Sequence, residues 1–153
     1  MERKQVAIDN FLKGYNCCQS IVLAFKDLVD IDEKSLAKLA SGFGGGMGRL
    51  RETCGAVSGV FMIIGLLYGY ESPETGEIKA KLYAKIQELG LQFEKEQGSL
   101  VCRELLGINE KHSSSTPSSR TSSFYKDRPC IKYIGFASEL LEEYIDKHKQ
   151  DNK

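Results

Sequence analysis

The spacing of apolar residues along the chain is the feature that most limits its fold. Between residues 74 and 97, apolar side chains recur every three or four residues, at Ile78, Leu82, Ile86, Leu89 and Phe93. This spacing places them on one face of an α-helix. Little of the chain alternates apolar and polar residues with the period of two that is typical of a half-buried strand. The sequence therefore predicts an all-α fold.

Glycines, capping residues and polar segments divide the chain into separate helices. Asn16 and Asp32 are suited to cap helices that start at the next residue. The stretch at residues 42–48, GFGGGMG, is expected to be a loop or turn. The expected helices span residues 2–13, 17–29, 33–40, 53–70, 74–97, 100–106 and 129–147. We expect a single-domain helical bundle of about five to seven helices.

The serine-rich segment at residues 112–123 is expected to be a flexible linker before the last helix. With this linker, the single helical domain is expected to cover residues 1–153.

Length and charge limit the classes of function. The chain has 153 residues with 21 Lys and Arg and 21 Asp and Glu, so its formal net charge is zero. This balance disfavours a nucleic-acid partner bound through bulk charge. The longest apolar stretch, residues 56–70, has 15 residues, fewer than the about 20 that a membrane-spanning helix needs. No apolar region follows the charged start, so we expect a cytoplasmic protein without a membrane span.

The five cysteines are the chain's most informative residues for function, and they are Cys17, Cys18, Cys54, Cys102 and Cys130. Disulfides are rare in cytosolic proteins, where cysteines more often indicate metal binding, catalysis or redox sensing. No CxxC pair is present, which excludes the usual zinc-ribbon and thioredoxin signatures. Each cysteine is expected in the first turn of a helix, where free amides and the helix dipole lower the pKa of a thiol.

Arginines stand close to three of these cysteines in sequence. Arg49 and Arg51 precede Cys54, Arg103 follows Cys102, and Arg128 precedes Cys130. Nearby positive charge also favours a thiolate. Together with Arg49 and Arg51, the glycine-rich stretch at residues 42–48 either binds an anion or forms only a tight turn between helices.

Small residues line one strip of the helix that starts near Cys54. Gly55, Ser58 and Gly59 fall on adjacent turns, although glycine inside a helix costs about 0.5–1 kcal/mol relative to alanine. The strip serves either close packing against another helix or the approach of backbone or a cofactor to Cys54.

Four of the cysteines lie in recognisable sequence contexts. Residues 54–59 read CGAVSG, Cys17 lies in YNCCQSI, Cys102 begins CRELLG, and Cys130 lies in RPCIKYIGF. With these residues the chain resembles the C_GCAxxG_C_C family of redox-active proteins, whose members carry four characteristic cysteines and a CGAxxG motif. The resemblance implies a redox site that contains Cys17, Cys54, Cys102 and Cys130, with Gly55, Ala56 and Gly59 as motif residues. Cys18 is additional, and is either a core residue or a resolving thiol.

Three functional hypotheses follow. In the first, the chain is a thiol–disulfide oxidoreductase that needs no cofactor, with Cys54 as the attacking thiolate and a redox protein or small molecule as partner. In the second, Cys17, Cys54, Cys102 and Cys130 bind Zn or an iron–sulfur cluster, and the arginines balance the charge. In the third, the chain is a non-catalytic helical module whose thiols only pack.

Overall fold

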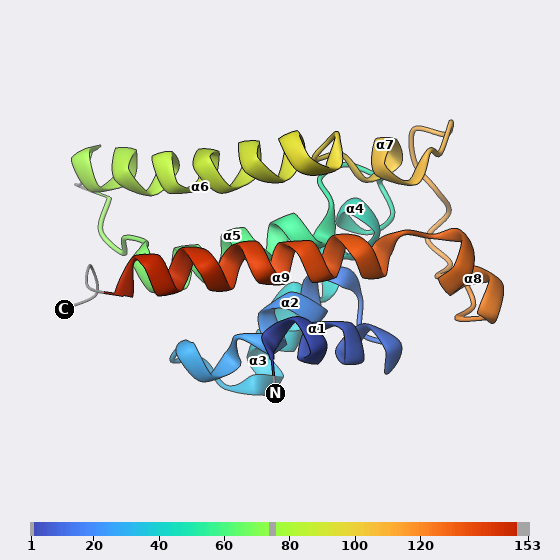
Figure 1. Ribbon diagram of the computed structural model, residues 1–153, viewed down its shortest axis with the longest axis horizontal. Coiled ribbons are helices and arrows are strands. Elements are labelled where there is room, and N and C mark those ends of the chain that lie inside the picture. The colour runs from blue at the N-terminus through green and yellow to red at the C-terminus, as the bar shows by residue number, and fades with distance from the viewer. Residues whose placement is uncertain (1, 74–75, 150–153) are drawn as a thin grey trace.

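The computed structural model describes residues 2–73 and 76–149, and these residues form a helical protein (Figure 1). The helices in chain order are α1 (Arg3–Leu12), α2 (Cys17–Ala24), η1 (Lys26–Leu28), α3 (Glu33–Ala40), η2 (Ser41–Phe43), α4 (Gly44–Met47), α5 (Gly55–Tyr68), α6 (Gly76–Gln97), α7 (Cys102–Leu106), α8 (Ser122–Asp127) and α9 (Cys130–Lys147). Across the described residues, β-structure is limited to an isolated bridge between Thr53 and Val101. The all-α prediction is confirmed.

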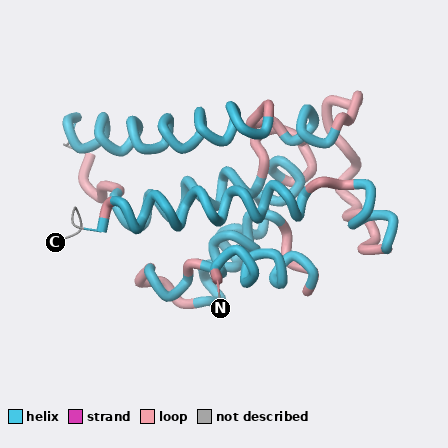
Figure 2. Tube along the Cα trace, in the orientation of Figure 1, coloured by secondary structure: helices cyan, strands magenta, loops and turns pink. Residues whose placement is uncertain are grey.

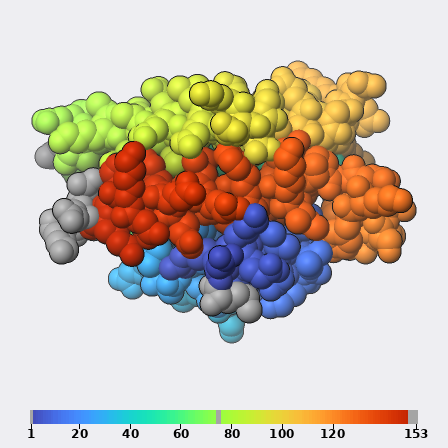
Figure 3. Space-filling model, viewed as in Figure 1, coloured from blue at the N-terminus to red at the C-terminus, as the bar shows by residue number. Residues whose placement is uncertain are grey.

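The helices form two layers. The long helices α5, α6 and α9 pack against one another, and α1, α2 and α3 lie below them in Figure 1. The layers meet where α2 packs on α5 and α1 packs on α9. In Figure 3, α6 and α9 lie side by side across the visible face of the molecule. None of the helices in residues 2–73 and 76–149 combines the length and the apolar character needed to span a bilayer.

Buried apolar side chains from both layers make up the hydrophobic core. The cluster draws on α1, α2, α3, α5, α6 and α9, and its fully buried members include Ile21, Leu36, Ile63, Ile134 and Leu141. Removing these side chains from water is the main favourable contribution to folding. Several loops gather at one end of the layers, here called the loop end, where α4, α7 and α8 lie and where α5 and α9 begin (Figure 2).

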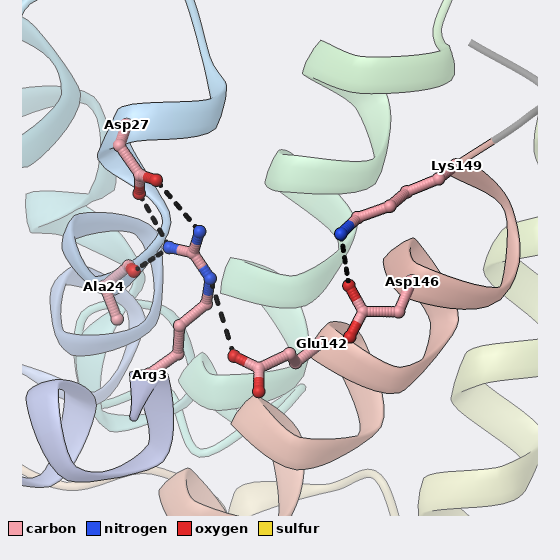
Figure 4. A network of polar contacts seen from close by, with 6 residues as sticks. All are labelled: Arg3, Ala24, Asp27, Glu142, Asp146 and Lys149. Carbon is pink, nitrogen blue, oxygen red and sulfur yellow. Dashed lines mark hydrogen bonds and ion pairs between the residues drawn. The ribbon is translucent and has the colours of Figure 1, made fainter. Parts of the chain in front are cut away.

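The second helix is shorter than predicted, because it ends at Ala24 instead of residue 29. Arg3 Nη1 donates to the carbonyl oxygen of Ala24 at 2.8 Å, and the same guanidinium pairs with both carboxylate oxygens of Asp27 at 2.6 and 2.9 Å (Figure 4). A carbonyl at the end of a helix needs such a partner. Arg3 Nε also lies 3.5 Å from Glu142 of α9, so one side chain joins α1, α2 and α9.

Two helix starts near the loop end fall later than predicted. Thr53 and Val101 were expected inside helices, but they pair with each other in the isolated bridge. This pairing needs extended backbone, so α5 begins at Gly55 and α7 at Cys102. The predicted start of α6, Glu74, lies outside the described residues. The short helices α4 and α8 were not predicted as helices.

Glycines allow α2 and α5 to cross closely. A Cβ on Gly55 would overlap the Cys17 sulfur, and a Cβ on Gly59 would lie 2.8 Å from Cβ of Ile21 and 3.1 Å from the carbonyl oxygen of Cys18. The small-residue strip therefore serves close helix packing.

Replacing Gly59 by alanine should destabilise the protein by about 1–3 kcal/mol, because the added methyl group overpacks the contact with α2. Gly65→Ala is the matched control in the same helix, since nothing lies within 4 Å of a Cβ there. It should stabilise the protein by about 0.4–1 kcal/mol, since alanine restricts the unfolded chain more than glycine does. Urea unfolding of both variants measures the difference, and equal free energies of unfolding would contradict the close crossing.

Candidate functional site

Four cysteines line one cavity at the loop end of the molecule. Cys17, Cys102 and Cys130 are the first residues of α2, α7 and α9, and Cys54 is the N-cap of α5. The prediction that the cysteines lie at helix starts is confirmed. All four contribute to the lining of a cavity of about 330 Å³. They are free thiols, as is Cys18.

Backbone pairing holds the starts of α5 and α7 together. On either side of the bridge, the amide of Cys54 donates to the carbonyl oxygen of Leu100 at 2.8 Å, and the amide of Cys102 donates to that of Glu52 at 2.5 Å. The positions of Cys54 and Cys102 are therefore set by main-chain hydrogen bonds, not only by side-chain packing.

A left-handed turn forms one wall of the cavity. Five consecutive residues, Gly45 to Arg49, have φ between 60° and 71°. Glycine adopts this conformation readily, whereas other L-residues lose about 1–2 kcal/mol each. The stretch at residues 42–48 is thus a turn, as predicted, but with the opposite hand to an ordinary helical turn. Three of the five residues are glycines, which adopt positive φ without strain, whereas Met47 and Arg49 are strained in this conformation.

The turn contacts two of the cysteines through adjacent glycines. A Cβ on Gly46 would lie 2.6 Å from Cβ of Cys102, and the backbone of Gly45 hydrogen bonds to the Cys17 thiol. Cys17 and Cys102 interact electrostatically with each other and with both Cys54 and Cys130. Such interactions weaken with distance, so the sulfurs of Cys17 and Cys102 lie close enough to Cys54 and Cys130 to raise the pKa of both thiols.

Arginine side chains make the cavity positive. Arg49, Arg51, Arg120 and Arg128 all line it, and its described lining includes neither Asp nor Glu. Arg51 is only 2% exposed. Its Nη1 lies 3.6 Å from Cys102 Sγ, and its Nε donates to Ser113 Oγ at 2.9 Å.

Arg103, the third arginine expected at the site, lies outside the cavity lining. It pairs with Glu52 at 3.3 Å and donates to the carbonyl oxygen of Arg51 at 3.1 Å. Its role is to hold the Arg51 backbone in place.

The serine-rich segment at residues 112–123 covers the cavity. Arg49 Nε donates to the carbonyl oxygen of Ser114 at 2.7 Å, and Arg49 Nη1 donates to Ser118 Oγ at 3.0 Å. Arg120 donates to the carbonyl oxygens of Phe11 and Tyr15 at 2.9 and 3.1 Å. The segment expected to be a flexible linker is therefore hydrogen bonded to the glycine turn and to the end of α1.

Sequence reasoning missed Arg120 and Tyr133 as lining residues. Arg120 is a single cation within a low-complexity segment, and no local pattern distinguishes it. The Tyr133 hydroxyl donates to the carbonyl oxygen of Leu105 at 3.0 Å, and its position became clear only once α9 was placed against α7. Arg128 was visible from its place beside Cys130 but was not assigned to the site.

The pKa values of three cavity thiols move in the direction opposite to prediction. Burial raises the pKa of Cys17 and of Cys130, and raises that of Cys54 well above its ordinary value. The first-turn amides of Ala56 and Val57 oppose this rise at Cys54, but burial outweighs them. Desolvation by burial disfavours a thiolate more than a helix start favours it, so the lowered pKa expected for Cys54 was wrong.

The remaining motif residues have distinct places. Gly55 and Ala56 line the cavity, whereas Gly59 packs against α2. Cys18 is fully buried in the core, with its Sγ 3.7 Å from Met62 Sδ, and does not belong to the cavity lining. Within residues 2–73 and 76–149, no three His, Cys, Asp or Glu side chains are grouped so that they could hold a metal ion.

Comparison with known proteins identifies the family of the chain. A family model described as "Putative redox-active protein (C_GCAxxG_C_C)" matches residues 15–144, which contain all five cysteines. No curated protein matches the chain, and no solved structure does.

The reduced protein should lose stability as the pH rises above about 8.5, the ordinary pKa of a thiol. Burial first, and then the sulfurs of Cys17 and Cys102, raise the pKa of Cys130 to about 12 in the folded protein. Between these two values the unfolded chain releases the Cys130 proton while the folded chain keeps it. The free energy of unfolding should therefore fall by up to about 1.4 kcal/mol per pH unit for this thiol.

Urea unfolding at about pH 8 and about pH 10 measures the loss, with Cys130→Ala as the control that removes one titrating thiol. The variant should lose about 2 kcal/mol less than the wild type over this interval. Equal losses would contradict the raised pKa.

Proposed function

Since the chain belongs to the C_GCAxxG_C_C family, we propose that it is a thiol–disulfide redox protein that works through the cysteine-lined cavity. The observation that carries the proposal is the gathering of four free thiols from four helices around one cavity, with a buried arginine beside one of them. Cys18 gives the contrast, because it fills space in the core and does not line the cavity with the arginines.

Cys102 is the attacking thiol in this proposal. It is the cavity cysteine whose sulfur has a guanidinium within hydrogen-bond distance, from Arg51 Nη1 at 3.6 Å. A neighbouring cation stabilises the thiolate, which is the nucleophile in thiol–disulfide exchange. The sequence favoured Cys54 as the attacking thiolate. Burial raises the pKa of the Cys54 thiol, and its sulfur has no such guanidinium contact within the described residues, so Cys54 is the weaker candidate.

Cys17 is the resolving thiol. It interacts electrostatically with Cys102, and both cysteines contact the same glycine turn through adjacent residues. Gly55 leaves room for the Cys17 sulfur, since a side chain at that position would overlap it.

The exchange proceeds in two steps. The Cys102 thiolate attacks an external disulfide RSSR, so a Cys102–SR bond forms, the S–S bond of RSSR breaks, and RS⁻ leaves. Cys17, having lost its proton, then attacks Cys102 Sγ, so a Cys17–Cys102 disulfide forms and the second RS⁻ leaves. The protons of the two protein thiols end on two RSH molecules. The protein is oxidised by two electrons and RSSR is reduced by two.

Oxidation of the reduced protein with 2-hydroxyethyl disulfide tests these roles. After free thiols are blocked with N-ethylmaleimide, mass spectrometry of the wild type should show a disulfide between Cys17 and Cys102. In Cys17→Ser the mixed disulfide should persist at Cys102, because the resolving thiol is missing. Cys102→Ser should slow exchange by about tenfold or more, because it removes the cavity thiol that lies beside the Arg51 guanidinium.

Cys18→Ala is the control for these variants, because Cys18 lies in the core away from the cavity lining. It should exchange at the wild-type rate. Failure of the wild type to form any disulfide or mixed disulfide at a cavity cysteine would refute the proposed function.

A further inference from the structure

Positive charges gather at the cavity, although the net charge of the chain is zero. The chain is neutral, with 21 basic and 21 acidic residues, yet four arginines line the cavity and its described lining holds no carboxylate. Within the described residues, Arg49, Arg51 and Arg128 form no ion pair, whereas Arg3 and Arg103 pair with Asp27 and Glu52. Burial lowers the pKa of Arg49, and the charges of Arg51 and Arg128 lower it further. These cations repel one another and lack an anion.

Arg51 shows where an anion would bind. Its guanidinium is buried, and two of its three nitrogens are engaged, Nε with Ser113 Oγ and Nη1 with Cys102 Sγ. The third nitrogen, Nη2, is buried without a hydrogen-bond partner. A buried charged donor without an acceptor is destabilising, so a ligand that supplies the acceptor gains binding energy. A guanidinium is well suited to carboxylates because its N–H groups match their geometry.

The rest of the cavity fits a short apolar chain. Phe11, Leu105, Leu106 and Ile134 form apolar wall beside the arginines, and the volume of about 330 Å³ is that of a small-molecule site. Arg120 contributes charge but is engaged by the carbonyl oxygens of Phe11 and Tyr15. Arg49 and Arg128 each donate to Ser118 Oγ through one terminal nitrogen. Unlike Arg120, these two arginines and Arg51 each keep a terminal nitrogen that makes no hydrogen bond within the described residues and can contact a ligand.

We infer that the cavity selects small-molecule disulfides that carry a carboxylate, with Arg51, Arg49 and Arg128 binding the carboxylate while Cys102 attacks the disulfide. This inference rests on the proposed function and adds the substrate class. The exchange is the one written above, with both R groups bearing a carboxylate, so two carboxylate-bearing thiols are released for each protein disulfide formed.

Three disulfides of similar size and different charge test the selection. They are 3,3′-dithiodipropionate, which is anionic, 2-hydroxyethyl disulfide, which is neutral, and cystamine, which is cationic. With the wild type at low salt, the anionic disulfide should react about tenfold or more faster than the neutral one, and the cationic one slowest. This preference should weaken when ionic strength rises from about 10 mM to about 150 mM.

Variants of the cavity arginines test whether these residues cause the preference for the anionic disulfide. Arg49 and Arg128 are half-buried, so Arg49→Gln and Arg128→Gln should fold and should each lower the ratio of anionic to neutral rates by about threefold. Arg51→Gln should lower the ratio most, but it replaces a buried side chain. Lys126→Gln removes an exposed cation of the neighbouring α8 outside the cavity lining and should leave the ratio unchanged.

Calorimetry with suberate separates this inference from the proposed function. Suberate has two methylene groups where 3,3′-dithiodipropionate has its sulfurs, so it tests carboxylate binding without exchange, and 1,8-octanediol is its uncharged control. Binding of suberate but not of the diol supports the inference. Equal rates with all three disulfides and no suberate binding would overturn it and leave the proposed function intact. Suberate binding without exchange would refute the proposed function and the choice of a disulfide, while supporting the anion site.

Discussion

The close crossing of α2 and α5 is the contact on which the rest of the arrangement depends. Without a side chain at Gly55 and Gly59, the two helices approach until the Cys17 sulfur and Ile21 fill the space that a Cβ would take. This contact joins the two helical layers. It also places the first turn of α2 beside the first turn of α5, so the core packing and the approach of the Cys17 sulfur to the start of α5 have one cause.

Desolvation and the favourable field of a helix start compete at three thiols of the cavity, Cys17, Cys54 and Cys130, and the sizes of the two effects decide the pKa of each. A helix N-terminus stabilises an exposed anion by about 0.3–1 kcal/mol, whereas burial of a titrating group can shift its pKa by several units. Burial therefore prevails at Cys17, Cys54 and Cys130, although each lies at a helix start. Cys102 differs from these three thiols in its geometry, because Arg51 Nη1 lies 3.6 Å from its sulfur.

Local patterns in the sequence were enough to predict the longer helices and the placement of cysteines at helix starts, but not the short helices α4 and α8. Capping at Asn16, with its side chain accepting from Gln19 at 2.8 Å, agrees with the expectation for α2. Properties that depend on the environment were not predictable in this way. The pKa of Cys54 depends on burial by neighbours from other helices, and Arg120 reaches the cavity only because residues 112–123 lie across it. Arg51 and Cys102 are 51 residues apart, so no local window contains both.

Each cavity cysteine lies at the start of a different helix. The hydrophobic core holds α2, α5 and α9 together, and main-chain hydrogen bonds hold the start of α7 beside that of α5. Connecting segments that do not line the cavity can therefore lengthen at small entropic cost, since loop closure depends only weakly on length. The number of residues between successive cysteines is consequently free to drift during evolution, while the residues next to each cysteine are not. A search for other proteins with this cavity should compare the short neighbourhoods of the cysteines and disregard their separation along the chain.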